Sequence, residues 1–305
     1  MGRWVIFLWG SLGLAVSPGL ADSPRRTPSF QSGVDIIRLN VSVTNRRAEY
    51  VTGLSDRDFA LFEDGARQAL TFFARDPLPV TLSLLIDCSA SMEEKLPTAQ
   101  EAGVRFIRTL GATDVGRVVQ FNDRVTTLQD FTADQAALES ALRRTQASGS
   151  TVLYDALYIN IKELSARDSR AAPRRRAIIL LSDGEDTTSH VTDEQVFALA
   201  GAADVAIFTI GLQPDARSDQ RFDRAAHFLS RIARETGGQT YFPHRLSEID
   251  SVYARIAEEL RSQYTLGYVS ANGVRDGRWR RIVVRTPEHD GLQVRYRLGY
   301  YAPRR

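Results

Sequence analysis

Oxygen-bearing side chains follow three short segments of this sequence. Asp87, Ser89 and Ser91 come at the end of an apolar run that begins at residue 80, Thr151 lies in a Ser- and Gly-rich stretch, and Asp183 follows a second apolar run. Two carboxylates and three hydroxyls form an all-oxygen set, which suits a hard cation such as Mg²⁺. The pattern predicts a site for Mg²⁺, with Mn²⁺ or Ca²⁺ as alternatives, built from these five residues.

The elements that would position this site are indicated by hydrophobic periodicity. Continuous apolar runs at 80–86, 115–121, 177–181 and 205–212 are typical of strands buried on both faces, and amphipathic helical segments separate them. This alternation predicts a doubly wound, mostly parallel α/β domain over residues 78–263. Ligands of such sheets bind beyond the carboxyl ends of the strands, which is where the oxygen-bearing residues fall.

Two β-rich segments flank this domain. Residues 33–76 and 264–305 show apolar residues at every second position, with turn signals at Asp64-Gly65 and Asp290-Gly291. In the second segment the alternation from Leu292 to Tyr300 has no break. Neither segment alone can bury much apolar surface. We therefore expect the two to pack together as one small β-sandwich, the alternative being two separate sheets that lean on the α/β domain.

The five residues also carry a resemblance to a known family. Asp87, Ser89 and Ser91 form a D-x-S-x-S motif, and with Thr151 and Asp183 they resemble the metal-ion-dependent adhesion site of von Willebrand factor type A domains. Bacterial secreted proteins related to these domains show similar flanks, here VTGL at 51–54, FEDG at 62–65 and GYYAP at 299–303.

The resemblance implies how the site would work. Ser89 and Ser91 would bind the metal directly, Thr151 directly or through water, and Asp87 and Asp183 through water. An Asp or Glu carboxylate of a partner protein would be the last ligand. The resemblance thus implies a metal-dependent adhesion or protein-binding module.

Charged residues near the site have two readings each. Glu185 and Asp186 could contact a partner, although surface acids are the simpler interpretation. Arg217 and Arg221 lie in a polar loop and could pair with acids of a partner, or be solvated loop residues. The run Arg174–Arg176 precedes a buried strand, and we expect a solvated flank there rather than a phosphate clamp.

Other function classes find little support. The chain has no G-x-S-x-G, H-E-x-x-H, P-loop or G-x-G-x-x-G motif, and its four histidines are scattered, so we expect no enzyme. The alternative is a Mg²⁺-assisted hydrolase of phosphoesters. A formal net charge of +2 argues against a nucleic-acid partner. Cys88 is the single cysteine, which excludes an intramolecular disulfide, and we expect it to pack beneath the site.

The first residues are typical of a targeting segment. Residues 1–21 contain one Arg, an apolar run from Val5 to Val16 and small residues at Gly19 and Ala21, as in a cleavable signal peptide. That run is short for a membrane span, so an uncleaved anchor helix is the alternative. Residues 22–32 form a polar, Pro-containing tail. The sequence predicts a secreted or periplasmic protein with no transmembrane segment in the mature chain.

Overall fold

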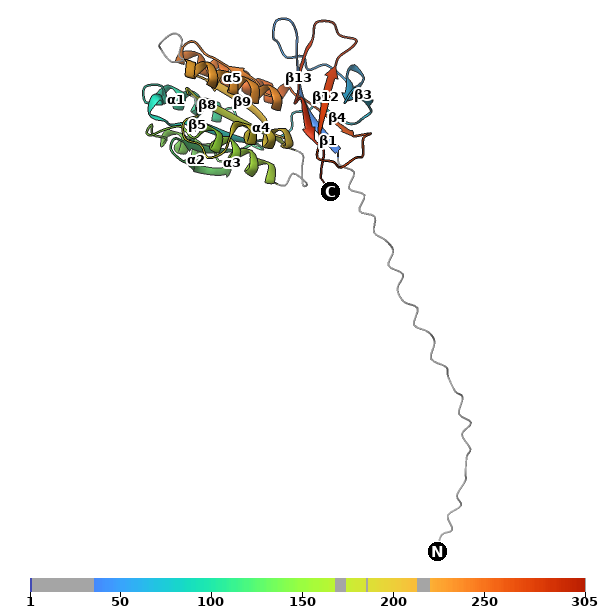
Figure 1. Cartoon of the computed structure of the whole chain (residues 1–305), viewed down its shortest axis with the longest axis horizontal. Coiled ribbons are helices and arrows are strands. Elements are labelled where there is room, and N and C mark those ends of the chain that lie inside the picture. The colour runs from blue at the N-terminus through green and yellow to red at the C-terminus, as the bar shows by residue number, and fades with distance from the viewer. Residues whose placement is uncertain (2–35, 168–173, 185, 213–219, 305) are drawn as a thin grey trace. The chain divides into compact units, whose positions relative to one another are not determined.

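The computed structural model describes residues 36–167, 174–184, 186–212 and 220–304 together with Met1, without the side chains of 220–222. The predicted signal peptide (Met1 apart) and polar tail lie outside these ranges. The unit from Asp35 to Arg305 consists of an α/β domain and two four-stranded antiparallel sheets (Figure 1). None of the described helices is long and apolar enough to cross a membrane.

The α/β domain is built on a six-stranded sheet of order β10-β9-β8-β5-β6-β7. All of its neighbouring strands are parallel except the β6–β7 hairpin. Its strands are β5 (Val80–Asp87), β6 (Val115–Phe121), β7 (Val125–Thr132), β8 (Arg175–Ser182), β9 (Ala206–Gly211) and β10 (Thr240–Tyr241). All eight residues of β5 are buried, because helices cover both faces of the sheet. The predicted doubly wound, mostly parallel sheet is confirmed.

In the described part of the chain, α-helices cover both faces of this sheet. Helices α1, α2 and α6 share one apolar cluster with the sheet, and α3, α4 and α5 share the other. Their bounds are α1 (Leu96–Ile107), α2 (Gln135–Arg143), α3 (Leu153–Ala166), α4 (Asp193–Ala202), α5 (Gln220–Thr236) and α6 (Ile249–Ser262). Single-turn helices lie at η1 (Asp56–Asp58), η2 (Ala90–Met92) and η3 (Leu246–Glu248).

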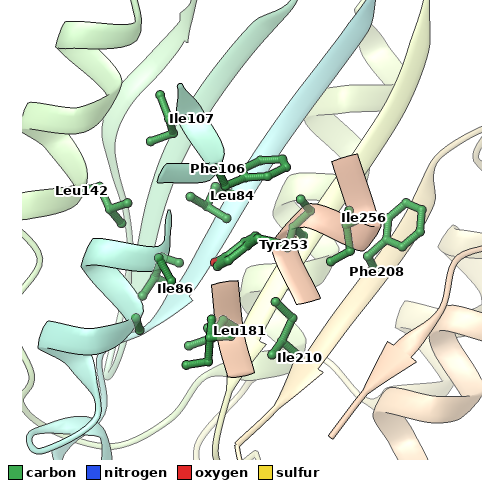
Figure 2. Close-up of a cluster of buried hydrophobic side chains, with 14 of the residues drawn as sticks. Leu84, Ile86, Phe106, Ile107, Leu142, Leu181, Phe208, Ile210, Tyr253 and Ile256 are labelled. Carbon is green, nitrogen blue, oxygen red and sulfur yellow. The ribbon is translucent and has the colours of Figure 1, made fainter. Parts of the chain in front are cut away.

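The first of these clusters joins α6 to α1 over the sheet. Figure 2 shows Tyr253 and Ile256 of α6 among side chains from the strands, with Phe106 of α1 close by. The rings of Phe106 and Tyr253 stack with their centroids 5.1 Å apart. These contacts hold α1, the first helix of the α/β domain, against α6, its last helix.

The flanking segments form one β-sandwich. One sheet has the order β13-β1-β11-β4 and the other β14-β12-β2-β3, so each contains strands from both ends of the chain. A single apolar cluster with members such as Leu39, Leu61, Leu266 and Ile282 lies between them. The strands are β1 (Ile36–Thr44), β2 (Ala60–Glu63), β3 (Ala66–Gln68), β4 (Leu70–Ala74), β11 (Tyr264–Val269), β12 (Trp279–Arg285), β13 (Gln293–Arg295) and β14 (Gly299–Tyr301). The expectation of a flanking sandwich made by both terminal segments is confirmed.

The residues with unbroken alternation from Leu292 to Tyr300 do not form one continuous strand. The chain forms β13 and β14 instead, and these belong to different sheets. Between them the backbone approaches the end of α5, where the Leu298 amide donates to the Glu235 carbonyl at 3.3 Å. Tyr296 and Tyr300 pack against the sandwich core, whereas Leu298 between them is exposed, so periodicity alone does not reveal the change of sheet.

The expectation of a solvated flank at Arg174–Arg176 is wrong for Arg175, which is 1% exposed. Its guanidinium donates to the carbonyls of Leu260, at 2.8 Å, and Gln263, at 2.5 Å, where α6 ends. Its backbone pairs with Val80 at the start of β5. Arg175 therefore fastens together the two places where the chain enters and leaves the α/β domain.

Candidate metal centre

The order in which the strands follow one another reverses between β5 and β8. The chain runs from β5 outward to β6 and β7, and then returns to β8 on the other side of β5. Asp87 is the last residue of β5, and Asp183 directly follows β8. The two carboxylates are thus placed at the switch point of a doubly wound sheet, the position at which such sheets bind ligands.

A chain of hydrogen bonds links four of the five predicted residues. Asp87 Oδ1 accepts from the Ser89 amide at 2.9 Å, and the Ser89 and Ser91 hydroxyl oxygens are 3.1 Å apart. The Ser91 hydroxyl donates to Asp183 Oδ1 at 2.8 Å. The other oxygen of Asp87 accepts from the Ser182 hydroxyl. The turn after β5 therefore brings the carboxylates of both strands into one polar cluster.

The loop that carries Thr151 is bonded to the D-x-S-x-S turn through Ser148 and Gly149, whereas Thr151 itself bonds to Thr187 in the loop after β8. The Ser148 amide donates to the Cys88 carbonyl at 2.8 Å, and the Ala90 amide donates to the Gly149 carbonyl at 3.1 Å. Gly149 has φ +74°, a conformation that glycine adopts without strain, so the loop can turn here. The Thr151 side chain is buried. The loop is thereby held against the D-x-S-x-S turn.

Burial determines the electrostatics of Asp87. The side chain is fully buried, and this desolvation raises the pKa of the carboxyl to about 6, against the lowering effect of hydrogen bonds from Ser182 and Ser89. Cys88, next to it, is buried in the apolar core, and burial raises the pKa of its thiol to about 12. The thiol is therefore a packing group at neutral pH, as expected from the sequence.

Lys95 is a member of the cluster that the sequence analysis did not identify. Its ammonium nitrogen lies 2.5 Å from Asp183 Oδ2, and the two side chains are 15% and 2% exposed. Two features of the sequence could have pointed to Lys95. It is one of only two lysines beside 37 arginines, and it lies eight residues after Asp87. A cation thus already lies against one of the two carboxylates.

The donor set fits a hard divalent cation. Two aspartates and three hydroxyl residues supply oxygen only, and the position of the Lys95 ammonium shows that Asp183 accepts a positive charge. Among the described residues no group of three or more His, Cys, Asp or Glu side chains could hold a metal. A metal here would therefore be held largely by neutral hydroxyls, with few carboxylates.

The residues predicted as partner contacts are only partly described. Asp186 Oδ1 accepts from the Tyr154 amide in the first turn of α3 at 3.1 Å, and both Asp186 oxygens also accept from Ser189. These bonds give Asp186 a role in shaping the loop. Glu185 and Arg217 lie outside the described residues, and so does the side chain of Arg221.

Known proteins resemble this chain in sequence and in fold. A UPF0353 protein of Mycobacterium avium is 27% identical over 218 residues, which are 64% of this chain and 64% of that protein. This chain thus spans less than two thirds of the curated relative's length. A von Willebrand factor type A structure from Catenulispora acidiphila has a TM-score of 0.50 at 13% identity and covers 90% of this chain and 76% of that one.

A second solved structure is proximal thread matrix protein 1 of the mussel byssus, described with a zinc-occupied MIDAS motif. It has a TM-score of 0.49 and 16% identity and covers 64% of this chain and 48% of that one. These structural likenesses concern the fold alone. The family model for the von Willebrand factor type A domain matches residues 82–255, which is more than half of the sequence. With its doubly wound sheet and its D-x-S-x-S turn at the switch point, this chain belongs to the von Willebrand factor type A domain family.

Proposed function

We infer that this protein is a metal-dependent binding module that captures an acidic side chain of a partner protein. The observation that carries this inference is the Asp87–Ser89–Ser91–Asp183 hydrogen-bonded cluster at the switch point of the sheet. Mg²⁺ held there by these residues and Thr151 would offer a coordination position to a carboxylate. Mn²⁺ or Ca²⁺ could take its place, since all donors are oxygen.

The chain's own residues divide the work of such a site. Ser89 and Ser91 supply neutral hydroxyls, so they bind a cation without cancelling its charge. Asp87 is buried and accepts hydrogen bonds that orient the turn, and Asp183 orients the Ser91 hydroxyl. Because only two carboxylates are present, a divalent cation keeps its attraction for an incoming anionic ligand. This supports recognition of an Asp or Glu side chain of a partner.

We also propose that the protein acts outside the cytoplasm. The proposal rests on residues 1–21, whose charged start, apolar run and small residues match a signal peptide. Export followed by cleavage near Ala21 would place the module in the periplasm or outside the cell. Mass spectrometry of the mature protein from envelope and medium fractions tests this, and an intact Met1 in those fractions would contradict cleavage.

Calorimetric titration with MgCl₂ tests the metal site directly. The wild type should bind one equivalent, and Ser89→Ala and Thr151→Ala should abolish binding. Ser140→Ala, an exposed hydroxyl change on α2, is the control and should bind as the wild type does. Metal binding that survives Ser89→Ala would place the cation elsewhere.

A second experiment tests what the loaded site does. Capture of a partner from envelope extract should fail with EDTA and with Ser89→Ala, and one Asp→Ala or Glu→Ala change in the partner should cause the same loss. Retention of the partner under both conditions would move the interface to another surface. Turnover of generic phosphoesters that requires Mg²⁺ and Ser89 would favour the hydrolase instead.

A further inference from the structure

The Lys95 side chain stands where a positively charged residue does not help its own helix. Lys95 is the N-cap residue of α1, and its side chain makes no capping hydrogen bond. The N-terminus of a helix carries partial positive charge, so an ammonium there is unfavourable for α1. No acidic residue in the first turn of α1 offsets it. The reason for a lysine at this position must therefore lie outside the helix.

That reason is visible in the contact with Asp183. The Lys95 backbone is fixed, because its amide donates to the Met92 carbonyl at 3.0 Å and its carbonyl accepts from the Ala99 amide at 3.1 Å. From this anchor the ammonium reaches Asp183 Oδ2, while Ser91 donates to Oδ1. Both oxygens of Asp183 are thus engaged by donors of the chain itself.

Lysine is rare in this sequence, so its presence at position 95 in place of arginine is informative. The chain contains 37 arginines and two lysines, of which Lys162 is exposed on α3. A guanidinium is a planar fork that pairs with both oxygens of a carboxylate, whereas an ammonium is a compact point charge on a flexible stem. With Ser91 already on Oδ1, a compact donor suits the remaining oxygen. A flexible stem can also withdraw toward solvent, to which the side chain is partly open.

We propose that Lys95 is an internal competitor of the divalent cation: its ammonium neutralises Asp183 in the metal-free site and weakens metal binding. This inference rests on the proposed function, since it concerns the same five-residue site. Two cations that share one carboxylate repel each other, so each lowers the affinity for the other. Lys95 thereby keeps the metal-free cluster intact and makes occupation of the site depend on the ambient metal concentration.

Titration of four variants with MgCl₂ or MnCl₂ tests the proposal. Lys95→Met removes the charge and keeps a stem of similar length, and Lys95→Gln removes the charge and keeps a polar end on a shorter stem. Both should bind the metal about tenfold more tightly, within the range of site-to-site couplings. Lys95→Arg keeps the charge and should bind no more tightly than the wild type. Lys162→Met is the matched control for loss of a lysine and should leave the affinity unchanged.

Thermal unfolding in EDTA supplies a readout that involves no metal. Lys95→Met should lower the midpoint, and Asp183→Asn should lower it much less in the Lys95→Met background than in the wild type, because the pair is already broken. Additive midpoint changes would show that the two side chains do not interact, which overturns the proposal even if every variant folds.

The outcomes separate this proposal from the proposed function. If wild type and Lys95→Met bind metal equally well, or the variant binds more weakly, the competitor role is wrong and the metal site stands. If none of the proteins binds metal, both proposals fail. If only the charge-neutral variants bind at accessible concentrations, the competition is stronger than stated and the proposal is supported.

Discussion

The carboxylate of Glu259 on α6 is fully buried against the guanidinium of Arg295 on β13. Glu259 also accepts from the Ser42 hydroxyl at 2.8 Å and from the Tyr50 hydroxyl at 3.0 Å. All three partners belong to the sandwich segments, whereas Glu259 belongs to the α/β domain. This buried pair therefore ties the last helix of one part to three positions of the other.

Breaking this pair from one side should destabilise the whole protein. Arg295→Met leaves the fully buried Glu259 carboxylate without its cation, and loss of one member of a buried ion pair costs about 3–5 kcal/mol. The double variant Glu259→Met with Arg295→Met should recover much of that loss. Urea unfolding of the wild type, the two single variants and the double variant measures both effects. Arg105→Gln, at an exposed pair with Asp250, is the control and should barely change the midpoint. Equal loss in single and double variants would contradict a coupled pair.

Gly237 should tolerate no side chain. It follows α5 with φ +81°, and a Cβ there would lie 2.6 Å from the Arg297 backbone nitrogen and 2.8 Å from the Tyr296 carbonyl carbon. Gly237→Ala combines this clash with a left-handed backbone that costs a non-glycine residue about 1–2 kcal/mol. We expect a loss of unfolding free energy at or above that figure. Gly53→Ala, where a Cβ meets nothing within 4 Å, is the matched control and should be close to neutral.

The acid limb of stability should depend on Asp58. The hydrogen bond from His289 has the largest effect on this carboxyl, and those from Ser55 add to it. Together they lower its pKa to about 2, from a usual 3.8. A depressed carboxyl pKa contributes stability that is complete above the unfolded value and is lost as the pH falls through the folded value. Between pH 4 and pH 2 the wild type should therefore lose more stability than Asp58→Asn. Urea midpoints across this range measure the difference, and Asp56→Asn is the control for charge alone.

Asp186 and Asp87 should behave differently toward metal. Because the oxygens of Asp186 serve loop and helix amides, Asp186→Asn should lower the unfolding midpoint without removing the stabilisation by Mg²⁺. Asp87→Asn should abolish that stabilisation, which for the wild type is about 2.7 kcal/mol at 100 times the dissociation constant. Differential scanning calorimetry with Mg²⁺ and with EDTA measures both. Loss of the Mg²⁺ effect in Asp186→Asn would make Asp186 part of the metal site.

Local sequence patterns predicted the buried strands and the oxygen-bearing residues that follow them, because these features depend on neighbours in the sequence. The run that becomes β5 is apolar throughout because both faces of the strand are covered, so it could be recognised together with Asp87 at its end. Lys95 was missed because its role depends on Asp183, which is distant in sequence and adjacent only once β5 and β8 pair. Arg175 was misread for the same reason, since the carbonyls that it binds lie at the end of α6. Charged residues that act across the fold leave no periodic signal.

The position of Arg175 has a consequence for the order in which the chain can fold. Ile36 pairs with Val269 and Leu61 with Val284, so each of these two strand pairings encloses the entire α/β domain as a loop. Closing so long a loop in a flexible chain carries an entropy penalty that a folded insert removes. Arg175, paired with Val80 and bonded to the Gln263 carbonyl, holds the two ends of that insert side by side. A folded α/β domain thus brings the two segments of the sandwich together, and β1 and β4 meet their partner β11 only after the whole domain has been synthesised.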